Sequence, residues 1–228
     1  GCIGTGSEHG AGRHGATEGN GMSDALIFYT NPMSRGRIVR WMLEEVGAPY
    51  QTEVMHYGPA MKSAGYRAIN PMGKVPALKH GDTIVTECAA ICAYLADAFP
   101  EVGLAPPLAQ RGAYYRWLFF AAGPLETAVM NRALGFEVPA EREAMAGHGN
   151  YATVMDALEK GVSGSDYIAG SAFTAADVYV GSQIGWGLQF GTIEERPAFP
   201  AYWQRVSDRD AYRRANHIDD ALRAPDAS

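Results

Sequence analysis

The segment between residues 70 and 78 (NPMGKVPAL) has an unusual order, with two prolines around a Gly-Lys pair ahead of an apolar run. Pro76 has no backbone N–H, so it fits only the start or the edge of a strand. A cis bond between Val75 and Pro76 would turn the N–H and C=O of Val75 outward, where they can pair with an extended peptide. The segment is therefore either a docking edge for a small peptide or an ordinary proline-containing turn.

A second segment, Thr86–Leu95, places a carboxylate at the start of a predicted helix. The first N–H groups of a helix carry a partial positive charge, which suits a carboxylate ligand. Glu87 can at the same time pair with an ammonium group. One helix start can thus hold both ends of a zwitterionic amino acid, unless Glu87 serves only to complement the helix dipole.

A third segment, residues 29–37 (YTNPMSRGR), joins a predicted strand to a predicted helix. Ser34 lies where a helix cap is expected, and capping is the simplest explanation of this residue. Its hydroxyl can also donate a hydrogen bond to a thiolate, which lowers the pKa of that thiol. Both roles stay open from the sequence alone.

The elements that position these segments form one compact α/β unit. Residues 25–30 (ALIFYT) are rich in strand formers and stop at the turn signal Asn31-Pro32. A helix with apolar residues at helical spacing follows and ends at Gly47. The remaining expected elements are a strand over 50–56, a polar loop to 70, a hairpin of strands over 75–79 and 83–85, and a helix over 87–99.

Strand signals vanish after a proline-rich linker, which predicts an all-α second domain. Its helical segments are expected over residues 109–134, 140–162, 175–188 and 200–215. The Gly-rich start of the chain lacks the apolar stretch of a secretory signal, and we expect a flexible tail there. The predicted boundaries are 1–21 for the tail, 22–99 for the first domain, 100–108 for the linker and 109–228 for the helical domain.

The composition excludes several classes of protein. The 228 residues include no apolar run approaching the roughly 20 residues of a membrane helix. The net charge of −6, without a long basic run, argues against binding to nucleic acid. The three cysteines lie at irregular spacing without a CxxC motif, which favours neither a disulfide framework nor a zinc site. We therefore expect a cytoplasmic protein without a bound metal.

Taken together, the three segments resemble the glutathione S-transferase family. The likeness includes P-x-S-R before the first helix, then N-P-x-G-x-V-P-x-L, then Glu and a small polar residue before A-x-I-x-x-Y-L. In the second domain, residues 116–123 (RWLFFAAG) resemble a long helix of bacterial members, and residues 173–177 (FTAAD) resemble an internal helix cap. The resemblance covers residues 25–217. It implies a thioredoxin-like α/β first domain, an all-helical second domain, a homodimer, and glutathione as co-substrate.

The resemblance also assigns glutathione to particular residues. It implies that the backbone of Val75, before Pro76, pairs with the cysteinyl part, and that Glu87 and the following Cys88 hold the γ-glutamyl end. Lys74 and Lys62 are the candidates for the glycine carboxylate.

Within the turn at residues 33–35, the resemblance implies that Ser34 activates the thiol. Tyr29, at the end of the first strand, is the alternative, because some subgroups use a tyrosine there. Arg35 is counted with the glutathione-binding residues and, with backbone N–H groups, is a further candidate for activation.

This sequence departs from the family pattern at two points. Cys88 stands where the family usually has Ser, and it is a weaker hydrogen-bond partner. No cysteine occupies the turn at residues 33–35, which argues against subgroups that form a mixed disulfide with glutathione. Cys88 and Cys92 are expected to pack rather than to bind metal, while a redox role for Cys88 stays open.

Three aromatic residues follow one another at helical spacing in the second domain: Tyr114, Trp117 and Phe120. They can face the pocket for the electrophile, and core or dimer packing explains the same stripe. The expected reaction is attack of the glutathione thiolate on a small apolar electrophile, by addition or displacement. The alternatives are glutathione-dependent disulfide or peroxide reduction, ether cleavage, and a binding protein without catalysis.

Overall fold

The computed structural model describes residues 25–223, and their first part forms a four-stranded sheet. Its strands are β1 (Leu26–Thr30), β2 (Tyr50–Val54), β3 (Ala77–His80) and β4 (Thr83–Thr86), in the order β2-β1-β3-β4. β1 runs parallel to β2 and antiparallel to β3. Successive side chains of β1 alternate between the faces of the sheet, so Phe28 and Thr30 are buried while Tyr29 points to the opposite face.

Four helices accompany this sheet: α1 (Gly36–Val46), α2 (Pro59–Lys62), α3 (Ala64–Ile69) and α4 (Cys88–Ala98). α1 ends as predicted at Gly47, which adopts a left-handed φ of 73°. The prediction of a polar loop before Asn70 is wrong, because α2 and α3 occupy most of that segment. α3 begins at Ser63, whose side chain accepts a hydrogen bond from the N–H of Tyr66. Helices this short are not visible as periodicity.

The second domain is all-helical, as predicted. Its helices are α5 (Gly112–Phe120), α6 (Glu126–Leu134), α7 (Tyr151–Ser163), α8 (Ala175–Phe190), α9 (Ala198–Ser207) and α10 (Asp210–Ala221). Short helical turns add η1 (Pro100–Val102) and η2 (Leu108–Gln110) in the linker and η4 (Ala140–Met145) before α7.

Three of the expected helical segments are interrupted, and the one over 140–162 is divided between η4 and α7. The segment over 109–134 consists of two helices joined by a π-helical turn, η3 (Ala121–Leu125), which contains Pro124. Proline lacks the N–H that a regular α-helix requires at this point. The segment over 200–215 is likewise divided, between α9 and α10.

The helix cap at the start of α8 is present as predicted. The side chain of Thr174 and that of Asp177 bond reciprocally to backbone N–H groups of the first turn. Asp177 also accepts hydrogen bonds from the N–H of Ile168 at 2.8 Å and the hydroxyl of Tyr202 at 2.7 Å. Burial raises the pKa of Asp177, against these hydrogen bonds. The cap thereby ties three parts of the helical domain together.

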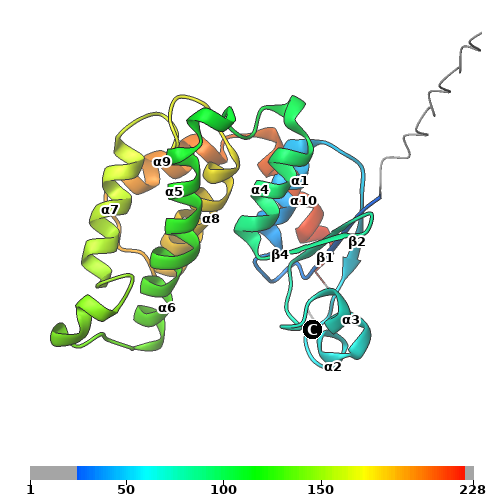
Figure 1. Cartoon of the computed structure of the whole chain (residues 1–228), viewed down its shortest axis with the longest axis horizontal. Helices are drawn as coiled ribbons and strands as arrows, with labels where there is room; N and C mark the ends of the chain where they lie inside the picture. Colours follow the sequence, from blue (N-terminus) through cyan, green and yellow to red (C-terminus); the bar gives the residue numbers. More distant parts are fainter. Residues whose placement is uncertain (1–24, 224–228) are drawn as a thin grey trace, which may run out of the picture.

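The last helix returns to the first domain. α10 packs along α1, and Figure 1 shows the two helices beside the sheet while α5 to α9 form a separate bundle. Arg40 on α1 donates through Nε to Asp219 on α10 at 3.1 Å, and each side chain is about 1% exposed. α10 therefore follows the helical domain in sequence but packs against the first domain.

Candidate active site

The loop that precedes β3 is held in place by side chains of α3 and of the residue that follows it. The hydroxyl of Tyr66 and the amide of Asn70 both donate to the carbonyl oxygen of Lys74, at 2.7 and 2.8 Å. The bond between Val75 and Pro76 is cis, as the sequence suggested. Among the described residues, neither the N–H nor the C=O of Val75 makes a turn or loop hydrogen bond. The backbone of Val75 is therefore open to a ligand beside the end of the sheet.

Glu87 occupies a special backbone conformation at the start of α4. Its φ of 70° is the one positive φ among the described residues other than glycine. Such a conformation costs about 1–3 kcal/mol and persists where the surroundings enforce it, often at functional sites. The Glu87 side chain is exposed and makes no hydrogen bond within residues 25–223, although it precedes the free N–H groups of the first turn. The carboxylate of Glu87, which accepts hydrogen bonds, thus lies beside the N–H groups at the start of α4, which donate them.

The turn before α1 is built on Asn31. Its amide donates to the carbonyl of Met55 at 2.8 Å and accepts from the N–H of Met33 at 2.9 Å. The Ser34 hydroxyl donates to the carbonyl of Asn31 at 2.7 Å and accepts from the N–H of Gly36 at 2.9 Å. Ser34 therefore closes the turn ahead of α1 and is partly exposed, while Arg35 is the N-cap residue and no side chain caps the helix.

Tyr29, the alternative to Ser34, lies on the face of β1 opposite to Thr30. Its ring packs against the ring of Tyr66, with centroids 5.8 Å apart. This position gives Tyr29 a packing role against α3.

The two candidate lysines differ in their surroundings. The ammonium group of Lys62 donates to the carbonyl oxygens of Met72 and Gly73, at 3.3 and 2.9 Å. Lys62 therefore supports the loop that carries Val75. Lys74 is exposed and forms no ion pair with the described residues, which leaves it the better candidate for a ligand carboxylate.

The Cys88 thiol is buried in the junction between α4 and the first turn. Its Sγ lies 3.6 Å from the carbonyl oxygen of Arg35, to which it donates. Burial raises the pKa of Cys88 to about 12; the Arg35 charge opposes this, and Glu126 and Glu87 add to it. Cys92 is also buried, and burial raises its pKa as well. Both cysteines are core residues of α4.

We expect Cys88 to be unreactive at neutral pH. With a pKa of about 12, only roughly 1 thiol in 10⁴ is ionised at pH 8, and the thiolate is the reactive form. Alkylation by iodoacetamide at pH 8, followed by mass spectrometry of each cysteine, should find Cys88 protected in the folded protein. The Cys88→Ser variant should lose activity under a mild disulfide stress to the same extent as the wild type. Selective resistance of the variant would instead demonstrate a redox role.

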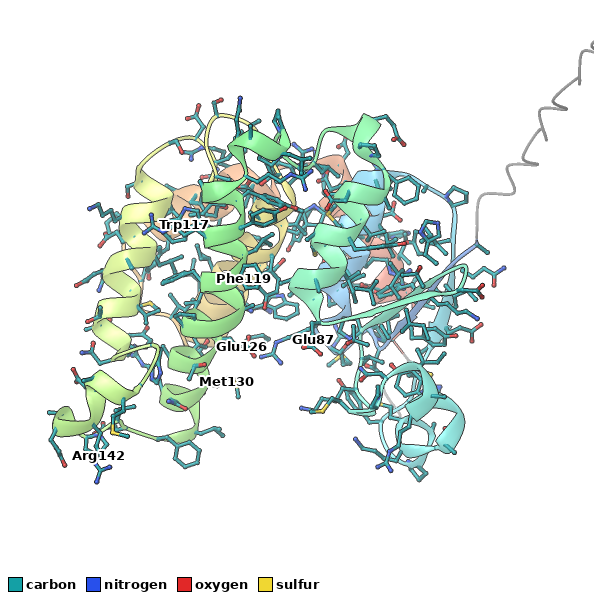
Figure 2. The ribbon with its side chains drawn as sticks, in the orientation of Figure 1. Glu87, Trp117, Phe119, Glu126, Met130 and Arg142 are labelled. Carbon is teal, nitrogen blue, oxygen red and sulfur yellow. The ribbon has the colours of Figure 1, made fainter. Side chains whose placement is uncertain are left out.

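The second domain contributes residues that the sequence motifs do not contain. Arg35 forms an ion pair with Glu126 at the start of α6, and Gln183 of α8 donates to the other carboxylate oxygen of Glu126 at 2.9 Å. Figure 2 shows Glu126 and Met130 on the side of the helical domain that faces Glu87. No sequence signal relates Arg35 to Glu126, because 91 positions separate them.

The aromatic stripe of α5 belongs to the core. Tyr114 and Trp117 are buried, and Trp117, 6% exposed, packs edge-on against Phe120 and over Gly161 of α7. Packing, one of the two explanations of this stripe, accounts for Tyr114 and Trp117, while Phe120 is only partly buried. The exposed aromatic residues of this helix are Tyr115 and Phe119, which are 42% and 73% exposed.

A cavity of about 560 Å³ opens between α6, α7 and the segment that joins them, lined among others by Arg132, Phe136 and Tyr151. None of the residues assigned to glutathione lines it. The chemistry of Ser34, Val75 and Glu87 therefore places the candidate site elsewhere. Among residues 25–223, no helix is long and apolar enough to cross a bilayer, and no three side chains gather as metal ligands.

The comparisons with known proteins identify the family. The family model for the glutathione S-transferase N-terminal domain matches residues 33–98, and that for the C-terminal domain matches residues 119–210. Glutathione S-transferase A of Pleuronectes platessa is 31% identical over 159 residues, which cover 65% of this chain and 70% of that relative.

Two solved structures show the same arrangement. A glutathione transferase from Methylococcus capsulatus superposes with a TM-score of 0.71 at 26% identity, covering 86% of this chain and all of that one. A sphingomonad glutathione S-transferase complexed with glutathione gives 0.68 at 28% identity, covering 85% and 98%. With its thioredoxin-like first domain and helical second domain, the chain belongs to the glutathione S-transferase family of enzymes.

Proposed function

We propose that the chain binds glutathione across Val75 and the start of α4, activates its thiol beside Ser34, and transfers it to small apolar electrophiles. The observation that carries the proposal is the strained, exposed Glu87 at a helix start. There it can hold the ammonium group of the γ-glutamyl moiety, while the helix N–H groups hold its carboxylate. The related sphingomonad structure that holds glutathione supports this ligand. Lys74 is the proposed partner of the glycine carboxylate.

The proposed catalytic task is to lower the pKa of the glutathione thiol. A free thiol has a pKa of about 8.5, and lowering it by two units corresponds to about 2.7 kcal/mol. A hydrogen bond to a charged group supplies about 1.5–3 kcal/mol. For Ser34 to donate this bond, its hydroxyl proton has to turn from the Asn31 carbonyl to the sulfur, a rotation about one bond.

Replacing Ser34 with alanine should raise the pKa of the bound thiol by about 1–2 units, because one charge-assisted hydrogen bond is lost. The thiolate exists above this pKa, so the pH–rate profile should move to higher pH and turnover at neutral pH should fall. Glutathione affinity should change less. The ultraviolet absorbance of the thiolate, titrated against pH in the complex, measures the shift.

Two further variants separate this role from the turn hydrogen bonds of Ser34 and from Tyr29. Ser34→Thr keeps a hydroxyl and should keep the titration near that of the wild type. Tyr29→Phe should leave it unchanged, since the ring of Tyr29 packs against that of Tyr66. A shifted titration in Tyr29→Phe together with an unshifted one in Ser34→Ala would assign activation to the tyrosine.

Other reactions on the same fold define the alternatives. Disulfide or peroxide reduction, ether cleavage, and binding without turnover all use the same glutathione site. A panel of electrophiles, hydroperoxides, disulfides and aryl ethers, applied after glutathione affinity chromatography, distinguishes them. We favour conjugation because the turn at Met33–Arg35 contains no cysteine for a mixed disulfide, and because the exposed Met33 and Phe119 offer apolar surface.

The proposal also includes a homodimeric assembly and a cytoplasmic location. Family likeness favours a homodimer, which light scattering on the purified protein tests directly. The few, irregularly spaced cysteines favour a cytoplasmic setting.

A further inference from the structure

The Arg35 side chain is held by the helical domain rather than by its own. Its Nη2 donates to Glu126 and lies 3.9 Å from the sulfur of Met130, both on α6. Glu126 and Met130 are four residues apart, so they share the face of α6 that meets the first domain. This contact joins the turn that carries Ser34 to α6 of the helical domain.

Glu126 is itself anchored. One of its carboxylate oxygens accepts from Arg35 and the other accepts from the amide of Gln183. Gln183 lies on the buried helix α8, and its amide also donates to the hydroxyl of Tyr179 at 3.3 Å. A chain of hydrogen bonds therefore runs from the core of the helical domain to the Arg35 guanidinium, which fixes the orientation of that group.

The Arg35 guanidinium retains unused donors. Arginine carries five N–H donors, and within residues 25–223 neither Nε nor Nη1 of Arg35 forms a hydrogen bond. The side chain is 45% exposed and directly follows Ser34 in the turn. A fixed cation with free donors thus lies beside the position where the proposed thiolate would attack.

Donors held in place are most effective where negative charge develops during a reaction. Addition of a thiolate to an α,β-unsaturated carbonyl compound is such a reaction. The sulfur bonds to the β-carbon, the electron pair of the C=C bond moves through the α-carbon, and the carbonyl oxygen becomes an enolate oxyanion. A proton from water then completes the thioether product. Displacement of halide from an alkyl carbon produces no oxyanion.

We propose that Glu126 is a positioning residue that holds Arg35 ready to stabilise an oxyanion on the electrophile, so that the preferred acceptors are α,β-unsaturated carbonyl compounds. This inference rests on the proposed transferase function and names the substrate class for it.

The test compares two acceptors, 4-phenyl-3-buten-2-one for addition and benzyl chloride for displacement, in the wild type and in Glu126→Ala, Arg35→Ala and the double variant. The ratio of kcat/KM for the enone to that for the chloride should fall roughly 10- to 100-fold in Arg35→Ala, the value of a hydrogen bond to a charged group. Glu126→Ala should lower the same ratio, mainly through kcat. The double variant should match Arg35→Ala, because Glu126 acts through Arg35.

The matched control is Arg213→Ala, since Arg213 is an exposed arginine paired with Asp208 and Asp210 outside the site. It should leave the ratio at the wild-type value. Glu126→Gln preserves the side-chain volume and repeats the test if the alanine variant loses stability in thermal melts. An unchanged ratio in Arg35→Ala, or additive losses in the double variant, would overturn the inference.

The same assay separates this inference from the proposed function. A wild type that conjugates benzyl chloride and not the enone retains the transferase function and refutes the substrate class. A wild type that accelerates neither reaction refutes both.

Discussion

Replacing Asp219 with alanine should lower the free energy of unfolding by about 3–5 kcal/mol, because it leaves a buried charge without its partner. The guanidinium of Arg40 is about 1% exposed and pairs with Asp219 at 3.1 Å. Its other partners are the hydroxyls of Tyr50 and Thr52, which are neutral. Burial raises the pKa of Asp219, with Arg40 opposing the shift. The burial of this pair is therefore costly, and each charge depends on the other.

Asp220 provides the matched control for Asp219. It is the next residue on α10, its side chain is 57% exposed, and it pairs with Arg37 at 2.9 Å. Exposed pairs contribute only about 0–1 kcal/mol, so Asp220→Ala should have a small effect on stability. Urea denaturation of both variants measures the difference. Similar losses in the two variants would show that the Arg40–Asp219 pair does not secure α10 against α1.

Replacing Glu87 with glycine should weaken glutathione binding by about 1.5–3 kcal/mol, since a hydrogen bond to a charged ligand group is lost. The same change should slightly stabilise the fold. The positive φ of Glu87 costs about 1–3 kcal/mol, and glycine adopts it freely, although its greater freedom in the unfolded chain removes about 0.5–1 kcal/mol of the gain.

Glu87→Ala separates the carboxylate from the backbone conformation. It should lose the same affinity without the gain in stability, because alanine keeps the unfavourable φ. Glu101→Ala, which removes an exposed carboxylate in the linker, is the control and should change neither quantity. Calorimetric titration gives the affinities and thermal melting the stabilities. An unchanged affinity in a folded Glu87→Ala protein would remove Glu87 from the site.

The sequence alone determined those features that depend on a few neighbouring residues. Asn31-Pro32 ends β1, Gly47 ends α1, and Thr174 with Asp177 caps α8, because proline, glycine and short polar side chains restrict the local backbone directly. The three segments that carry Ser34, Val75 and Glu87 could be recognised for the same reason. Each is a short run whose chemistry is local.

The tertiary structure decided the features that depend on which face a helix presents. The π-helical turn at Pro124 sets the orientation of α6, and only then does Glu126 meet Arg35. Trp117 fits the core because Gly161 of another helix leaves room for its ring. α10 packs on α1 of the first domain, where Asp219 meets the buried Arg40. Such pairings join residues far apart in the chain, and helical periodicity gives the apolar face of one helix without its rotation or its partner.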